Sequence, residues 1–143
     1  MTLVRFNHME LTYGRGELTP GLRAEIDAFY GDVFGWDGRD VPVMNQQGHL
    51  LRVDDEQFIL LLEADQPISS PGYDHLGLLM EDRVAVDATL ERCRAWQQRD
   101  ERVQVKEYDD LDTPNLTVHA FYVRYLLPIW FDVQVLEPKP VNA

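Results

Sequence analysis

The sequence predicts an α+β protein built from two tandem modules, each with the order strand, helix and three strands. The succession of strand-like and helix-like patterns in the first half of the chain recurs in the second half. A segment rich in proline, serine and glycine lies between them. The chain ends in two runs of β-branched and aromatic residues, which are typical of paired strands. We therefore expect a first module over residues 1–65, a linker over 66–72 and a second module over 73–143.

The first module begins with a predicted strand from Val4 to Tyr13, where side chains alternate in polarity. Thr19 and Pro20 are typical of a helix start, and apolar residues at helical spacing continue until Gly35, which predicts a helix of about four turns. Turn-forming residues at 45–48 and 54–56 separate three short extended segments. These predict a meander of strands over Val41 to Met44, Leu50 to Val53 and Phe58 to Glu63.

The second module repeats this order. A strand is expected from Tyr73 to Met80 and a helix from Glu81 to Gln98, with Cys93 on its apolar side as a packed thiol. Three further strands are predicted over Val103 to Tyr108, Val118 to Tyr125 and Ile129 to Leu136, with a turn at Leu126 to Pro128. The acidic residues between 107 and 112 are expected to form a solvated loop.

Each predicted helix covers one face of its sheet and leaves the other face free. Pairing the two sheets edge to edge would make one cupped mixed sheet with the helices on its outer face. Because strand side chains alternate between faces, the concave side would collect every second residue of three strands. These residues are Phe6, His8, Glu10, His75, Gly77, Leu79, Trp130, Asp132 and Gln134.

The composition indicates a soluble globular protein of 143 residues, with 45% apolar residues and a net charge of -12. Nucleic acid and anionic membranes are disfavoured as partners, because both are bound mainly by basic side chains. No apolar run approaches the roughly 20 residues that span a bilayer, and the N-terminus lacks a signal-peptide pattern. We therefore expect a cytoplasmic protein. The acidity is compatible with a cationic ligand, but it also serves solubility.

His8 and His75 occupy matching places in the two modules, each near the start of the opening strand. A pseudo-twofold axis would bring them face to face. Imidazole is a common ligand of first-row metals, and two histidines with an oxygen donor form the type of site that non-haem iron and related enzymes use. The alternative is that each histidine is an ordinary strand residue.

In its element order and in four segments, the chain resembles the vicinal oxygen chelate superfamily. This superfamily includes glyoxalases, extradiol dioxygenases, fosfomycin-resistance enzymes and bleomycin-resistance proteins. The segments span nearly the whole chain in the expected order: Phe6 to Leu11, Ala28 to Trp36, Asp74 to Leu78 and Val133 to Pro138. The resemblance implies a glyoxalase-like fold and a small-molecule ligand.

The resemblance also implies a divalent metal, iron, manganese, zinc or nickel, held by the opening strand of each module and by the last strand. His8 and His75 match the histidine ligands. Gln134 falls where the superfamily usually has glutamate, and a neutral amide binds hard cations less well than a carboxylate does. Asp132 shares its face and could substitute if the strand shifted. A further ligand late in the fourth strand would fall at residue 61 or 63.

Other residues of the cup are candidates for binding the substrate. Tyr122 resembles a tyrosine that extradiol dioxygenases carry near the metal, although a strand tyrosine is more often an ordinary packing aromatic. Trp130 and Asp132 would line the same hollow, and Glu10 could act as a base or orient the histidine beside it. The acid–base histidine of such dioxygenases has no convincing match, because His119 lies on the opposite face and residue 49 falls in a predicted turn.

Two functions from different classes therefore remain open. The first is a metal-dependent enzyme that chelates two substrate oxygens, as the superfamily does, with a Lewis-acid metal on His8, His75 and an oxygen donor from Gln134 or Asp132. The second is a metal-free protein that sequesters an aromatic or cationic compound, using Tyr122, Trp130 and acidic side chains. For either function we expect a homodimer, the commonest assembly for small soluble proteins.

Overall fold

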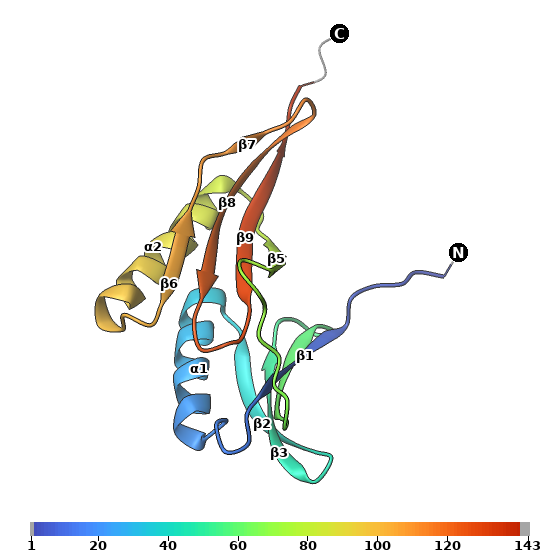
Figure 1. Cartoon of the computed structure of the whole chain (residues 1–143). Helices are drawn as coiled ribbons and strands as arrows, with labels where there is room; N and C mark the ends of the chain where they lie inside the picture. Colours follow the sequence, from blue (N-terminus) through green and yellow to red (C-terminus); the bar gives the residue numbers. More distant parts are fainter. Residues whose placement is uncertain (1, 141–143) are drawn as a thin grey trace. The chain divides into compact units, whose positions relative to one another are not determined.

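The computed structural model describes residues 2–140 and has the predicted α+β fold. The chain divides into two compact units, Met1–Ser69 and Ser70–Ala143. Each unit contains one mixed sheet and one helix (Figure 1). The strands thus form two separate mixed sheets, where the sequence analysis expected one continuous sheet.

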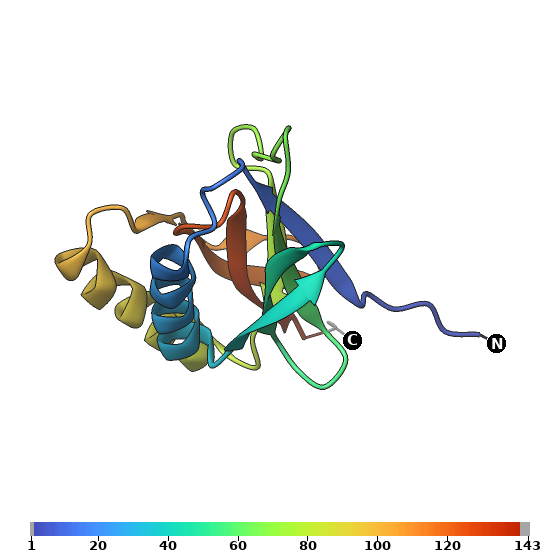
Figure 2. The same cartoon turned by 90° about the horizontal axis from the view of Figure 1, so that it is seen from below.

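The first unit has the order strand, helix and three strands. Its sheet has the strand order β1-β4-β3-β2, in which β1 is parallel to β4 and the other neighbours are antiparallel. Figure 2 shows α1 as a separate helix beside this sheet. The elements are β1 (His8–Tyr13), α1 (Pro20–Phe34), β2 (Asp37–Val43), β3 (Gln46–Arg52) and β4 (Phe58–Glu63).

Helix α1 begins and ends where the sequence predicts. The Thr19 side chain accepts a hydrogen bond from the backbone N–H of Leu22 at 3.1 Å, and Pro20 is in the first turn. Gly35 ends the helix in the left-handed region at φ 73°, a conformation that glycine adopts without a steric penalty.

Two local predictions in the first unit are wrong. Strand β1 starts at His8, and Phe6 lies before it, 92% exposed. The hairpin between β2 and β3 turns on Met44 and Asn45 alone, both at positive φ (47° and 65°), which is the two-residue turn that matches strand twist. Residues 46–48 therefore belong to strand β3, and so does His49.

The two faces of the first sheet differ in burial. Leu11 pairs with Leu61 in register, and both side chains are 0% exposed on the face that α1 covers. His8 pairs with Phe58 on the opposite face, where His8 and Glu10 are exposed. The predicted alternation of β1 is confirmed from residue 8 onward.

His49 lies on the helix-covered face between two carboxylates and is 2% exposed. Its Nε2 is 2.6 Å from Asp27 Oδ1 on α1, and its Nδ1 is 2.7 Å from Asp40 Oδ1 on β2. Arg23 Nε lies 3.0 Å from the same Asp40 oxygen, and a Cβ at Gly38 would come within 1.8 Å of Asp27 Oδ1. The hydrogen bond from His49 lowers the pKa of the Asp40 carboxyl. We call the group of His49, Asp27, Asp40 and Arg23 the first clasp.

The second unit repeats the order with one added short strand. Its sheet has the order β5-β9-β8-β6, with β7 paired to β8, and β5 is parallel to β9. The predicted final hairpin is confirmed as the antiparallel pair of β8 and β9. The elements are β5 (His75–Leu79), α2 (Arg83–Arg99), β6 (Gln104–Glu107), β7 (Leu111–Asp112), β8 (Leu116–Arg124) and β9 (Trp130–Pro138).

Helix α2 covers one face of this sheet. Asp82 caps its start by accepting a hydrogen bond from the Ala85 N–H at 2.7 Å. Cys93 is 0% exposed, and burial raises the pKa of its thiol to about 12, so it is the packed residue that the sequence predicts. The sheet residues on the side of α2 are also buried, among them Phe121, Phe131 and Val133.

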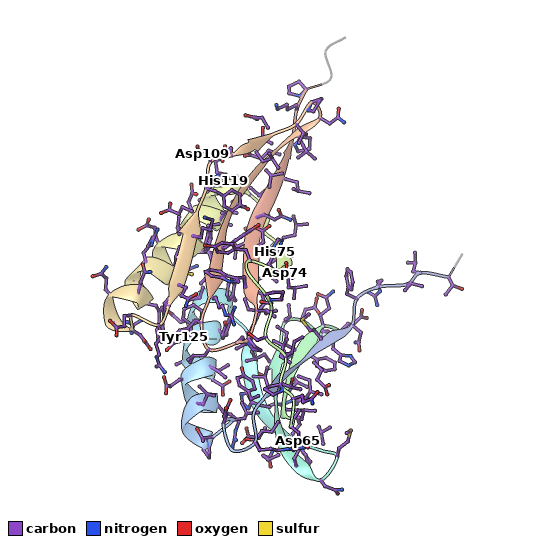
Figure 3. All side chains as sticks on the ribbon, viewed as in Figure 1. Asp65, Asp74, His75, Asp109, His119 and Tyr125 are labelled. Carbon is purple, nitrogen blue, oxygen red and sulfur yellow. The ribbon has the colours of Figure 1, made fainter. Side chains whose placement is uncertain are left out.

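A second clasp holds α2 to its sheet. His119 Nε2 lies 2.6 Å from Asp87 Oδ1 on α2, and its Nδ1 lies 2.7 Å from Asp110 Oδ1 (labels in Figure 3 mark His119). Arg83 contacts Asp110 at 2.7 Å and Glu137 at 2.5 Å. This network of His119, Asp87, Asp110 and Arg83 is the second clasp.

The two clasps are equivalent residue by residue. In both helices the aspartate follows the arginine by four positions, as in Arg23 and Asp27. Asp40 is the register partner of His49 across β2 and β3. In the second unit Leu111 pairs with Val118, so the preceding aspartate lies opposite the following histidine in the same way. The internal repeat therefore extends from element order to a specific polar network.

The second clasp predicts a pH-dependent stability. Burial lowers the pKa of His119, but hydrogen bonds to Asp87 and Asp110 outweigh burial and the charge of Arg83, and they raise this pKa above its ordinary 6.5. A raised histidine pKa stabilises the folded state below about pH 6.5, and this stabilisation is lost as pH rises through the folded-state pKa. The loss is on the order of 1 kcal/mol, because solvent screens the exposed Asp87.

Urea unfolding of the wild type and His119→Gln at a series of pH values measures this effect. As pH rises above about 6.5, the wild type should lose on the order of 1 kcal/mol more stability than the variant. Parallel pH profiles for the two proteins would contradict a charged clasp.

Candidate functional site

The face of the second sheet that α2 does not cover carries the candidate site. Tyr122 of β8 pairs in register with Asp132 of β9, which pairs with Gly77 of β5. Register partners point to the same side, so these residues share a face with Trp130 and Gln134. The predicted alternation of the last strand, with Trp130, Asp132 and Gln134 on one face, is confirmed.

Asp132 is the buried charge of this face, with 7% of its surface exposed. The Tyr108 hydroxyl donates a hydrogen bond to its Oδ1 at 3.1 Å, while Oδ2 lies 3.6 Å from His75 Nε2. Burial raises the pKa of the Asp132 carboxyl and outweighs the opposing effects of Tyr108 and His75. An ionised Asp132 therefore destabilises the folded protein unless a nearby cation offsets its charge.

His75 is held by its other ring nitrogen. Nδ1 lies 2.9 Å from the backbone carbonyl oxygen of Tyr73, which can only accept, so Nδ1 carries the hydrogen. Nε2 of the neutral ring then has a free lone pair, and this is the nitrogen nearest Asp132. The imidazole also packs against Tyr122, with ring centroids 4.9 Å apart. Figure 3 labels His75 where β5 begins.

Four aromatic rings surround this pair. Tyr73 lies 5.0 Å from Trp130 and 6.0 Å from Tyr122, and Tyr108 lies 5.1 Å from Tyr122, measured between ring centroids. Trp130 is 8% exposed and Tyr73 is 49% exposed, so Tyr73 forms the accessible rim. We call these rings the aromatic wall.

Tyr73 and Tyr108 are site residues that the sequence analysis missed. Both are end residues of predicted strands, and in the structure they lie just outside them, Tyr73 before β5 and Tyr108 after β6. The available signal for Tyr73 was alternation, because it precedes the predicted ligand His75 by two residues in the predicted strand and so shares its face.

Gln134 lies two residues beyond Asp132 and is partly exposed. Its Nε2 is 3.7 Å from the position that a Cβ at Gly77 would occupy, so the amide lies over the glycine backbone. The oxygen donor that approaches His75 Nε2 is the Asp132 carboxylate.

His8 is held in the first unit in a way that resembles His75. Its Nδ1 lies 2.7 Å from Asn7 Oδ1, and its ring stacks on Phe58 at 4.7 Å with a 2° angle between planes. Asn7 thus orients His8, a role that the sequence analysis considered for Glu10, which is exposed on the same face. With the Asn7 oxygen accepting from Nδ1, Nε2 of His8 is the nitrogen left for a ligand.

The expected further ligand at position 61 or 63 is wrong. Leu61 is 0% exposed on the face that α1 covers. Glu63 lies on that same face, and its Oε2 accepts a hydrogen bond from the Leu18 N–H at 3.0 Å. The parallel register places Phe58 beside His8, so the even-numbered residues of β4 share its face.

His75 and Asp132 fit a divalent metal as two of its ligands. Imidazole nitrogen and carboxylate oxygen are ligands that zinc, iron, manganese and nickel accept. Two such atoms at about 2.1 Å from a tetrahedral ion stand about 3.4 Å apart. The observed separation of 3.6 Å is close to this value. Over residues 2–140, neither unit by itself gathers three His, Cys, Asp or Glu side chains into a metal-binding group.

Comparisons with known proteins find the fold again in solved structures. A glyoxylase/bleomycin resistance protein/dioxygenase domain from a Frankia species matches with 16% identity and a TM-score of 0.62, covering 95% of this chain and 94% of that one. The fosfomycin resistance protein FosX from Listeria monocytogenes matches with 14% identity and a TM-score of 0.62, covering 92% and 91%. A glyoxalase/bleomycin resistance protein from Albidiferax ferrireducens matches with 15% identity and a TM-score of 0.55, covering 94% and 98%.

No protein-family model and no curated protein matches the sequence. At the identities above, structural likeness establishes the fold and leaves the activity open. The chain shares the fold of these glyoxalase, bleomycin resistance and fosfomycin resistance structures, so the glyoxalase-like fold that the resemblance implied is confirmed. Among the helices of residues 2–140, none has the length and apolarity needed to span a membrane.

Proposed function

We propose that this protein is a metal-dependent enzyme acting on a small substrate, with a divalent metal held by His75 and Asp132 of the second unit. One observation carries the proposal. His75 Nε2 and Asp132 Oδ2 lie 3.6 Å apart, while Tyr73 and Tyr108 hold the other ring nitrogen and the other carboxylate oxygen. Metal ligands in proteins are typically held by such outer hydrogen bonds.

In this proposal Asp132, and not Gln134, is the oxygen ligand from the last strand. A carboxylate supplies the charge that an amide lacks. A metal also offsets the burial that raises the pKa of Asp132. Gln134, on the same face beside Gly77, would then be available to hydrogen-bond the substrate.

The residues of the site have separate tasks in this scheme. A bound divalent metal would supply Lewis-acid stabilisation of negative charge on two substrate oxygens. Burial and the neighbouring Asp132 raise the pKa of the Tyr108 hydroxyl, so this hydroxyl stays protonated and donates a hydrogen bond to Asp132. Trp130 and Tyr122 provide an apolar surface against which a substrate can pack.

The aromatic wall favours a second candidate, a metal-free binding protein for an aromatic compound. Tyr73, Tyr108, Tyr122 and Trp130 give the face a ring-lined surface whether or not a metal is present. Names of the similar structures include both resistance proteins and a dioxygenase domain. Metal content separates the two candidates.

The test is elemental analysis of protein purified without chelator and supplemented with iron, manganese, zinc or nickel. The wild type should hold about one metal per chain, and His75→Ala should lose at least about tenfold of that affinity. Glu10→Gln, which removes a carboxylate of the first unit, is the control and should keep its metal. A wild type without metal, or a His75→Ala variant with unchanged affinity, would leave the binding protein as the better account.

A further inference from the structure

We infer that the site selects an aromatic acid, a planar ring that carries a negatively charged group, and that Lys106 recognises the charge. This inference rests on the proposed function and adds the chemical class of the ligand. Lys106 is a cation on the aromatic wall and is not one of the proposed metal ligands.

Lys106 lies on the site face of the second sheet. It is a residue of β6 and the register partner of Tyr122 on β8, so both side chains are on the side away from α2. Its Nζ lies 4.9 Å from the centroid of the Tyr73 ring, within the range of a cation–π contact. The ammonium group therefore stands at the rim of the aromatic wall, beside its most exposed ring.

The two lysines of the chain have different partners. Lys139 Nζ pairs with Asp112 at 3.2 Å. Over the described residues 2–140, the contact found for Lys106 is the Tyr73 ring, and no carboxylate lies within 4.0 Å of its ammonium group. Although the chain has 25 acidic and 13 basic side chains, the Lys106 ammonium group contacts an aromatic ring, where a ligand can approach it.

The charges on this face favour an anionic ligand once a metal is bound. Asp132 is the buried carboxylate of the face, and one of its oxygens is bonded to Tyr108 while the other is directed at His75. A divalent metal beside Asp132, together with Lys106, would leave the face net positive. An anion then gains from both cations, whereas a cationic ligand would compete with Lys106 for the Tyr73 ring.

The aromatic wall would bind the planar ring of the ligand, while Lys106 would bind its charge. Tyr73 is 49% exposed and lies 5.0 Å from the nearly buried Trp130, so a planar ring can pack against Tyr73 and cover the edge of the wall. A ring with adjacent hydroxyl and carboxylate groups offers two neighbouring oxygens as well as a negative charge. A 2-hydroxybenzoate is the simplest compound of this type.

The test is calorimetric titration of metal-loaded protein with three probes of nearly equal size. These are the anion 2-hydroxybenzoate, neutral 2-hydroxybenzamide and cationic 2-(aminomethyl)phenol. The acid should bind at least about tenfold more tightly than either analogue. Lys106→Gln should weaken acid binding about tenfold and change amide binding less than about twofold. Lys139→Gln removes the same charge away from the ring contact and should bind all three probes as the wild type does.

Tyr73→Leu should weaken the acid and the amide alike, because it removes the ring and not the charge. Equal effects of Lys106→Gln and Lys139→Gln, tighter binding of the amine, or binding of none of the probes would overturn the inference. The same measurements distinguish a failure of this inference from a failure of the proposed function. If the protein holds no metal but its acid binding still depends on Lys106, the inference stands and the metal-dependent function fails. If the protein holds metal but its acid binding does not depend on Lys106, the metal-dependent function stands and the inference fails.

Discussion

Asp132→Asn is expected to lower the affinity for a divalent metal at least ~100-fold while leaving the metal-free protein as stable as the wild type or more stable. The loss of affinity follows because asparagine keeps the shape of the side chain and removes the charge that faces His75 Nε2. The Tyr108 hydroxyl can still donate to the amide oxygen.

Burial raises the pKa of Asp132 in the folded state, so the charged carboxylate destabilises the metal-free protein at pH values above that pKa. A neutral asparagine removes this cost. The wild type without metal should therefore gain stability as pH falls through the raised pKa, and the variant should lack that gain.

Metal affinity is measured by competition with a chromophoric chelator, and stability by urea unfolding in excess chelator. Gln134→Ala is the matched control, since it changes the next residue on the same face and should alter metal affinity less than about tenfold. A larger effect at Gln134 than at Asp132 would return the role of ligand to the amide.

His49→Ala is expected to destabilise the first unit by about 3 kcal/mol, the largest loss of folding stability that we predict. The change leaves the carboxylates of Asp27 and Asp40 beside a cavity without the ring that bridges them. Their side chains are 36% and 50% exposed, so solvent reduces the cost below that of a fully buried pair.

Urea unfolding at constant slope measures this loss through the midpoint. His119→Ala is the matched variant in the second unit and should cost less, because its side chain is 20% exposed against 3% for His49. Removing Asp27 together with His49 should recover part of the loss, as the remaining carboxylate then stands alone. A His49→Ala protein within about 0.5 kcal/mol of the wild type would show that the first clasp does not hold the helix.

Much of the fold could be read from local chemistry. Thr19, Pro20 and Gly35 predicted both ends of the first helix, because caps depend on neighbouring backbone groups alone. The start of β1 was misplaced because the alternation of polarity in the sequence includes Phe6, whereas strand pairing does not extend to this exposed residue. The β2–β3 hairpin was misread because Met44 and Asn45 make a tighter turn than the polar residues after them suggest.

The candidate site was predictable only as far as alternation reaches. Alternation placed Asp132 and Gln134 on one face but could not choose between them, since a shift of two residues keeps the face unchanged. The 3.6 Å distance to His75 is a tertiary fact that favours Asp132. Tyr108 is 24 residues from Asp132 in the chain, so its hydrogen bond had no local signal.

The most direct test of the proposed centre is the anomalous scattering of manganese in crystals grown with Mn²⁺. The account predicts a single strong peak within about 2.3 Å of both His75 Nε2 and Asp132 Oδ2. Well-ordered His75 and Asp132 side chains with no peak between them, or a peak held by other residues, would contradict it.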